Sequence, residues 1–81
     1  MTTPENIQRY IAAGLPCEHL AVSGDGQHFE AVIVSAQFAG KLPIQRHQMV
    51  YAVLGDRMRE EIHALSMSTL TPEEWAARGA R

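Results

Sequence analysis

The chain has 81 residues, of which 46% are hydrophobic, and a formal net charge of −2 at pH 7. This length predicts one domain, residues 1–81, with a thin core made by one layer of helices on one small sheet. The acidic balance disfavours a strongly basic nucleic-acid-binding protein. The only cysteine, Cys17, excludes an internal disulfide and an all-thiol zinc or iron–sulfur site built by this chain alone.

No membrane-spanning segment or secretory leader is expected. No apolar run approaches the roughly 20 residues that span a bilayer. The opening stretch MTTPENIQRY lacks the basic and apolar regions of a secretory signal. Because a lone cysteine suits a reducing compartment, we expect a cytoplasmic protein.

The first predicted element is a helix near the N-terminus. Thr2 or Thr3 can cap it, and Pro4 has a backbone angle that suits a first helical turn. Gly14 and Pro16 end it. Its apolar residues recur at helical spacing and form one stripe: Ile7, Tyr10, Ile11 and Leu15.

Two strands are expected next, joined as a hairpin. Residues 18–23 alternate between apolar and polar, and residues 29–36 form a second strand after the turn signal Gly24-Asp25-Gly26. The centre of the second strand, residues 32–34, is apolar on both faces. That pattern is typical of a strand that is central in a sheet or covered on both sides.

A second helix is predicted from Pro43, with a short further turn from Asp56 to Glu61. Its expected apolar stripe, widened by Val50 and Met58, consists of Ile44, His47, Tyr51 and Leu54. A third strand follows over residues 62–70. The last element is a short helix, in which Thr71 and Glu74 have capping-box spacing and Trp75 attaches the helix to the body of the domain.

The four histidines, His19, His28, His47 and His63, are the main candidates for chemistry. Their spacing matches no motif that builds a metal site from one chain. His47 is expected to be half-buried and bonded to a neighbouring backbone group or to Tyr51. For His63, at the entrance of the third strand, the pattern alone does not decide between packing and metal binding. His28 would lie near His63 if the second and third strands are neighbours, which would give half of a tetrahedral ligand set for a partner to complete.

The sequence gives little reason to expect an enzyme. Cys17 follows Pro16 without an aspartate or histidine arranged around it, so a passive thiol is expected. No pair of acid and base that would form a pocket is apparent, and so thin a domain seldom encloses a substrate.

Five segments together resemble one family. They are His28-Phe29, Val34-Ser35-Ala36-x-Phe38-x-Gly40, Arg46-His47-x-x-Val50-Tyr51, Ile62-His63-Ala64-Leu65-Ser66 and Thr71-Pro72-Glu73-Glu74-Trp75. In this order and spacing, over residues 5–75, they resemble the BolA family of small stress-response and iron–sulfur accessory proteins. The loop stretch VSGDGQHF is most similar to the bacterial subgroup with a compact hairpin loop.

The resemblance implies an α+β fold of the class II KH-like type. This fold has a three-stranded mixed sheet with helices packed on one face, in the order α-β-β-α-(α)-β-α. KH domains that bind nucleic acid clamp its backbone with a GxxG loop. Gly40-Lys41-Leu42-Pro43 lacks the second glycine, so no such clamp is expected here.

The resemblance also implies a partner, a monothiol glutaredoxin of the CGFS type. In the family, a glutaredoxin cysteine and glutathione share a [2Fe–2S] cluster with a histidine of the BolA-like protein, and the matching motif assigns that role to His63. A hairpin-loop ligand of some members falls on Asp25, a hard oxygen donor poorly suited to such iron. His28 is the nearby substitute. Alone, the chain is expected to hold no cofactor and to be a monomer or weak homodimer.

The matching Arg46-His47 pair suggests a partner-facing surface for Arg46 and a structural role for His47. The alternative function is a nucleic-acid-binding transcriptional regulator with a basic helix face. Its expected phosphate contacts are Lys41, Arg46, Arg57 and Arg59. The acidic balance and the missing GxxG loop rank this hypothesis second.

Overall fold

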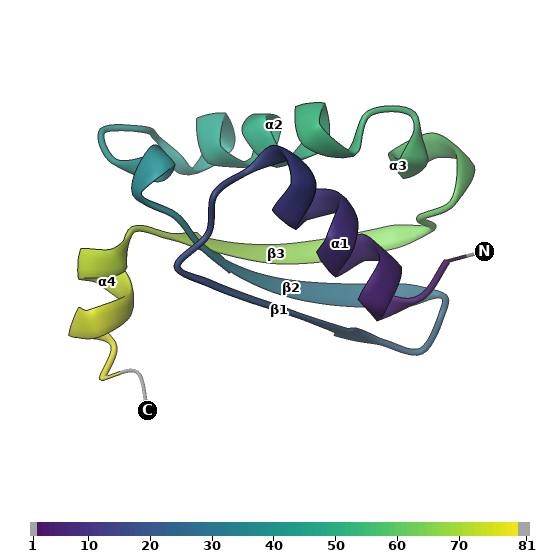
Figure 1. Ribbon diagram of the computed structural model, residues 1–81, viewed down its shortest axis with the longest axis horizontal. Helices are drawn as coiled ribbons and strands as arrows, with labels where there is room; N and C mark the ends of the chain where they lie inside the picture. The colour runs from purple at the N-terminus through teal and green to yellow at the C-terminus, as the bar shows by residue number, and fades with distance from the viewer. Residues whose placement is uncertain (1, 80–81) are drawn as a thin grey trace.

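The computed structural model describes residues 2–79, and its elements follow the predicted order (Figure 1). They are α1 (Pro4–Gly14), β1 (His19–Gly24), β2 (His28–Val34), the 3-10 turn η1 (Ala36–Phe38), α2 (Pro43–Leu54), α3 (Arg57–Glu60), β3 (Ala64–Leu70) and α4 (Pro72–Ala77). The chain is therefore an α+β protein, as expected.

The three strands form one mixed sheet in the order β1-β2-β3. β1 and β2 pair antiparallel, and β2 and β3 pair parallel with α2 and α3 in the crossover between them. β2 is central, which explains why residues 32–34 are apolar on both faces. In the parallel ladder His28 stands opposite Ala64 and Val34 opposite Leu70. The hairpin tip and the entrance of β3 therefore lie at the same end of the sheet.

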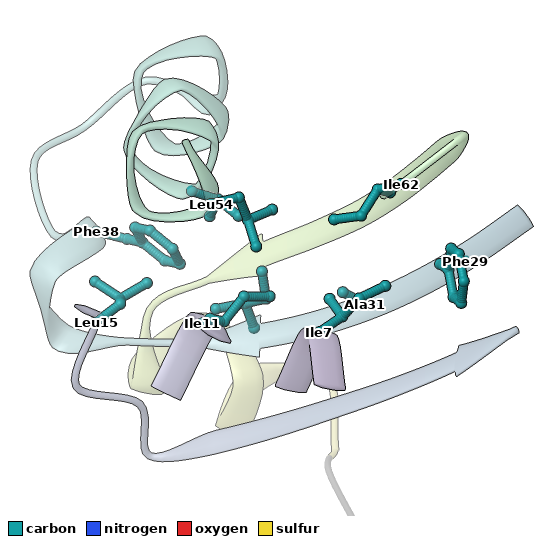
Figure 2. Close-up of a cluster of buried hydrophobic side chains, with 10 residues drawn as sticks. Ile7, Ile11, Leu15, Phe29, Ala31, Phe38, Leu54 and Ile62 are labelled. Carbon is teal, nitrogen blue, oxygen red and sulfur yellow. The ribbon is translucent and has the colours of Figure 1, made fainter. Parts of the chain in front are cut away.

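The hydrophobic core lies between the sheet and the helices α1 and α2, which cover the same face (Figures 1 and 2). Ile7 and Ile11 of α1 and Leu54 of α2 are fully buried against Phe29 and Ile33 of β2. Burying one such side chain stabilises the fold by about 1.5–3 kcal/mol. This packing fixes which residues of each strand face away from the helices.

The core-facing side of α2 differs from the predicted stripe. Its buried residues are Arg46, Val50 and Leu54, spaced four apart. Ile44 is 65% exposed and Tyr51 is 42% exposed, so the prediction that both belong to the core is wrong. The reason is that the long Arg46 side chain occupies the core-facing phase of the helix, which turns Ile44 toward solvent.

His47 is half-buried on α2, as predicted. The hydrogen bonds of residues 2–79 include none from its ring to Tyr51 or to the backbone, so that part of the prediction has no support. His47 therefore packs at the flank of the helix rather than anchoring a polar network.

The last helix, α4, departs from the single helical layer. Leu20 and Val22 of β1 pack against the core, so His19, on the alternate positions, faces the opposite side of the sheet. The Trp75 ring of α4 stacks on the His19 ring with centroids 4.6 Å apart. Trp75 thus attaches α4 to the domain as predicted, but on the face that α1 and α2 leave open. Val34, beside His19 in the ladder, is fully buried there.

Both predicted capping motifs are present. The Thr3 hydroxyl accepts a hydrogen bond from the backbone N–H of Asn6 at 3.2 Å and so begins α1. At α4, the Thr71 hydroxyl accepts from the N–H of Glu74 at 3.1 Å, and the N–H of Thr71 donates to the Glu74 carboxylate at 2.9 Å. This reciprocal pair satisfies two backbone donors at the start of the helix.

Candidate metal-ligand site at the end of the sheet

His63 lies between a buried anchor and a strand. The preceding residue, Ile62, is 3% exposed and packs in the core, and its N–H donates to the carbonyl of Arg57 at 3.0 Å. The following residue, Ala64, begins β3. The backbone is therefore held on both sides, while the His63 side chain is exposed. β3 begins two residues later than predicted, so His63 lies at the bend before the strand rather than within it.

The β1–β2 hairpin tip is ordered by Asp25. Its Oδ1 accepts hydrogen bonds from the backbone N–H groups of Gln27 and His28, both at 2.9 Å. The N–H of Asp25 in turn donates to the carbonyl of His28 at 3.2 Å. These N–H groups, that of His28 first and that of Gln27 second, lower the pKa of the Asp25 carboxyl. The carboxylate is thus engaged in the turn.

The parallel pairing brings His28 close to His63. His28 and Ala64 are partners in the ladder, and His63 directly precedes Ala64, so the expectation that the two histidines lie at one sheet end is confirmed. Both side chains are exposed. Within residues 2–79 no three or more His, Cys, Asp or Glu side chains are grouped as a metal site. By itself this end of the sheet offers at most a partial ligand set.

Arg46 is a structural residue. It is 8% exposed, and its guanidinium donates to the carbonyls of Lys41 at 3.0 Å and Thr69 at 3.1 Å. It also forms a two-pronged ion pair with the Glu74 carboxylate at 2.7 and 3.2 Å. The prediction that Arg46 belongs to a partner-facing or phosphate-binding surface is therefore wrong, because its donors are used inside the protein.

The Arg46–Glu74 pair is the polar contact that sequence reasoning missed. The guanidinium of Arg46, followed by the backbone N–H of Thr71, lowers the pKa of Glu74 from 4.5 to about 2. A sequence signal did exist, since Arg46, Val50 and Leu54 share one helical face. An arginine in phase with two core residues points to an internal partner.

The remaining basic residues lie at the two ends of α2. Lys41 precedes α2 and Arg57 follows it, and a 12-residue helix spans about 18 Å. The Arg57 guanidinium lies over the Tyr10 ring, 4.1 Å from its centroid. Arg59 pairs with Asp56 at 2.9 Å. Two of the three remaining basic side chains thus contact groups of this chain.

Cys17 has the environment of a passive thiol. It is half-buried, and its S–H donates to the carbonyl of Leu15 at 3.3 Å. Burial, and secondly the nearby charge of Glu18, raise its pKa. A raised pKa lowers the thiolate fraction and with it the reactivity.

Among the described helices, none has the length and apolar character required to cross a bilayer.

Comparison with known proteins places this geometry in a family. Residues 12–74 match the family described as BolA-like protein. The chain is 43% identical over 60 residues to "DNA-binding transcriptional regulator BolA" of Haemophilus influenzae, covering 74% of this chain and 58% of that protein. It is 41% identical over 80 residues to "Protein BOLA2" of Arabidopsis thaliana, covering 93% of this chain and 85% of the relative.

The solved structure of a BolA protein homologue from Coxiella burnetii is similar with a TM-score of 0.85 and 42% identity, over 94% of this chain and 99% of that one. These relatives carry the names of a regulator and of BolA proteins rather than of enzymes. The chain spans little more than half the length of the Haemophilus relative, but it spans nearly all of the Coxiella structure. Matched over most of its length in both sequence and structure, this chain belongs to the BolA-like protein family.

Proposed function

We propose that the protein is a non-enzymatic accessory protein that pairs with a monothiol glutaredoxin of the CGFS type. In this proposal the two proteins and glutathione share a [2Fe–2S] cluster, and His63 is the ligand from this chain. The pair would act in iron–sulfur trafficking or in iron and redox sensing. The proposal starts from membership of the BolA-like protein family and is supported by the geometry around His63.

The observation that carries the proposal is the state of His63. Its side chain is exposed, and the hydrogen bonds of residues 2–79 include none from its ring. The backbone on either side is fixed by Ile62 and β3. A free imidazole on a rigid support is what a metal ligand requires, because little ordering entropy is lost on binding.

The other two candidate ligands at this end of the sheet, Asp25 and His28, differ in how well their donor atoms suit an iron–sulfur cluster. Asp25 is engaged by two backbone N–H groups and offers an oxygen donor, whereas iron–sulfur clusters are held by thiolate and imidazole ligands. His28 is exposed and supplies a second nitrogen. A histidine in place of a cysteine raises the potential of a [2Fe–2S] centre. The missing ligands have to come from the partner, because no larger group of ligands is present in residues 2–79.

The test is an anaerobic reconstitution of this protein with a CGFS glutaredoxin, glutathione, iron and sulfide. We expect a mixed complex whose visible absorption and circular dichroism differ from those of the glutaredoxin alone. His63→Ala should abolish that difference. His28→Ala should weaken the complex or shift its spectrum, and His47→Ala, which alters a half-buried ring on α2, serves as the matched control.

If His63→Ala leaves the mixed-complex spectrum and its lifetime unchanged, the ligand assignment is wrong. If the wild-type protein forms no complex with the glutaredoxin with or without iron, the pairing itself is wrong.

Nucleic-acid binding is the second candidate function, favoured by the names of the Haemophilus influenzae and Vibrio cholerae relatives, "DNA-binding transcriptional regulator BolA". In this chain its basic residues would be Lys41, Arg57 and Arg59, without the buried Arg46. A fluorescence titration with duplex DNA at low and at high salt tests it. Binding that weakens steeply with salt would support it, and no binding at low salt would exclude it.

A further inference from the structure

The face of the sheet opposite α1 and α2 is covered only at one end, by α4. Phe29, Ala31 and Ile33 of β2 point into the core, so His28, Glu30 and Val32 point to this open face. The same alternation places Ser66 and Ser68 of β3 there, since Leu65 and Met67 pack against the core. Residues toward the hairpin end of this face are therefore mostly small or polar.

Glu30 stands at the centre of a row across all three strands. The ladders pair Ser23 with Glu30 and Glu30 with Ser66, so a carboxylate on the central strand is flanked by a hydroxyl on each side. All three residues are exposed. Among residues 2–79 the salt bridges are Arg46–Glu74 and Arg59–Asp56, so Glu30 has no internal cation. A solitary negative charge on a flat face is a natural contact for an external cation.

The surface next to Glu30 is hollowed. A depression of about 130 Å³ is lined by Glu30, Ala31, Val32, Ser66, Met67 and Ser68. For comparison, a cavity of about 150 Å³ accommodates benzene, so the depression is large enough for the head of one long side chain. Its polar side chains are one carboxylate, which accepts, and two serine hydroxyls, which can rotate to accept as well as to donate.

The lining favours an organic cation over a metal ion. One carboxylate with serine hydroxyls is too few hard donors for a bound divalent ion, and residues 2–79 contain no group of three or more His, Cys, Asp or Glu that would hold one. A guanidinium or ammonium group needs only acceptors. The planar fork of arginine has five N–H donors, enough to reach Glu30 and both hydroxyls at once.

The hollow lies on the same face of the sheet as His28, one of the two candidate histidine ligands. His28 is two residues before Glu30 on the same strand and the same face, a separation of about 6.5–7 Å along the strand. A partner that bonds to His28 would therefore cover the adjoining part of the open face. His28 and Glu30 would lie under one partner.

We propose that the glutaredoxin partner lies across this open face and places a cationic side chain in the hollow beside Glu30. This inference rests on the proposed function and adds the orientation of the partner and the chemistry of a contact outside the cluster. The contact orients the partner on the sheet before any iron is bound, so it acts on the iron-free complex as well.

The experiment measures binding of the iron-free CGFS glutaredoxin by calorimetry at low and at high salt. The variants are Glu30→Gln and, as the matched control, Glu73→Gln, which makes the same charge change at an exposed position on α4. We expect Glu30→Gln to weaken binding about fivefold or more at low salt, with a smaller loss at high salt, and Glu73→Gln to change it less than about twofold. Amide signals of Glu30, Ser66 and Ser68 should shift when the wild-type complex forms.

The outcomes separate this inference from the proposed function. If the wild-type protein forms the mixed cluster through His63 but Glu30→Gln binds as tightly as the wild type, the docking inference is wrong and the cluster proposal stands. If the shifted amides lie on α1 and α2 instead, the partner uses the other face and the inference is again wrong. If the wild-type protein does not bind the glutaredoxin at all, both the docking inference and the cluster proposal are wrong.

Discussion

The two ends of the sheet differ in whether their polar side chains are bonded within the protein or exposed to solvent. At the α4 end, Arg46 and Glu74 form two contacts with each other, and the Trp75 ring stacks on His19. At the hairpin end, His28 and His63 are exposed beside a turn held by Asp25. Both ends carry conspicuous sequence motifs. The difference teaches that a motif residue whose bonds are all made internally supports the fold, whereas one left free on a rigid backbone is available to a partner.

The largest effect on stability is expected for Arg46→Met. The substitution leaves the carbonyls of Lys41 and Thr69 without their donor and removes the cation beside Glu74. We expect the free energy of unfolding to fall by about 2–3 kcal/mol, measured by urea denaturation. The control is Arg59→Met, which removes an exposed ion pair and should cost less than about 0.5 kcal/mol. Equal losses in the two variants would contradict the structural role of Arg46.

A smaller loss is expected for Trp75→Ala. The stack on His19 and the cover over the α4 end of the sheet disappear, while the capping box of Thr71 and Glu74 remains. We expect a loss of about 1–2 kcal/mol in thermal or urea unfolding. The amide signals of His19 and Val34 should move and those at the hairpin tip should not. A change spread over both ends would show that the two regions are coupled.

Acid should weaken the α4 end through Glu74. Its pKa is lowered from 4.5 to about 2 in the folded protein, so the folded state favours the charged carboxylate. The stabilisation is fully present above pH 4.5 and is lost as the pH falls from there toward about 2. Unfolding measured across this interval should show a decline that Glu74→Gln reduces. If that variant declines as steeply as the wild type, other carboxyls, such as Asp25 with its lowered pKa, account for the acid sensitivity.

The smallest effect on stability is expected at the other end. His63→Ala and His28→Ala remove exposed rings, so each should change the free energy of unfolding by no more than about 0.5 kcal/mol. The measurement is the same urea titration used for Arg46→Met. A loss of 2 kcal/mol or so for His63→Ala would mean that the ring supports the fold, and it would erase the contrast between the two ends.

Local patterns predicted the features that depend on neighbouring residues. Residue spacing predicted the order of the elements and the cap at Thr71. It narrowed the first cap to Thr2 or Thr3, and it identified β2 as a strand that is central or covered on both faces. The third strand was predicted to within two residues of its observed start at Ala64, so His63 lies just before the strand and not within it as predicted.

Features that join distant segments were not predictable in this way. Arg46 and Glu74 are 28 residues apart, and only the folded sheet brings α2 and α4 together. The same contact turns Arg46 to the buried side of α2. Ile44 was predicted in the core because it is apolar, but it lies on the exposed side of the helix. The spacing of apolar residues predicts that one side of a helix is buried. It does not decide between two neighbouring sides when a long arginine side chain occupies one of them.

The parallel alignment of β2 with β3 has one more consequence. Both strands start at the same edge, so the tip of the first hairpin projects next to His63 while the strands behind it keep their register through the buried Phe29 and Ile33. Residues between Gly24 and His28 can therefore be exchanged or lengthened without disturbing the interior. The donor atoms that the tip presents beside His63 can thus differ from one sequence to another while the position of His63 stays the same.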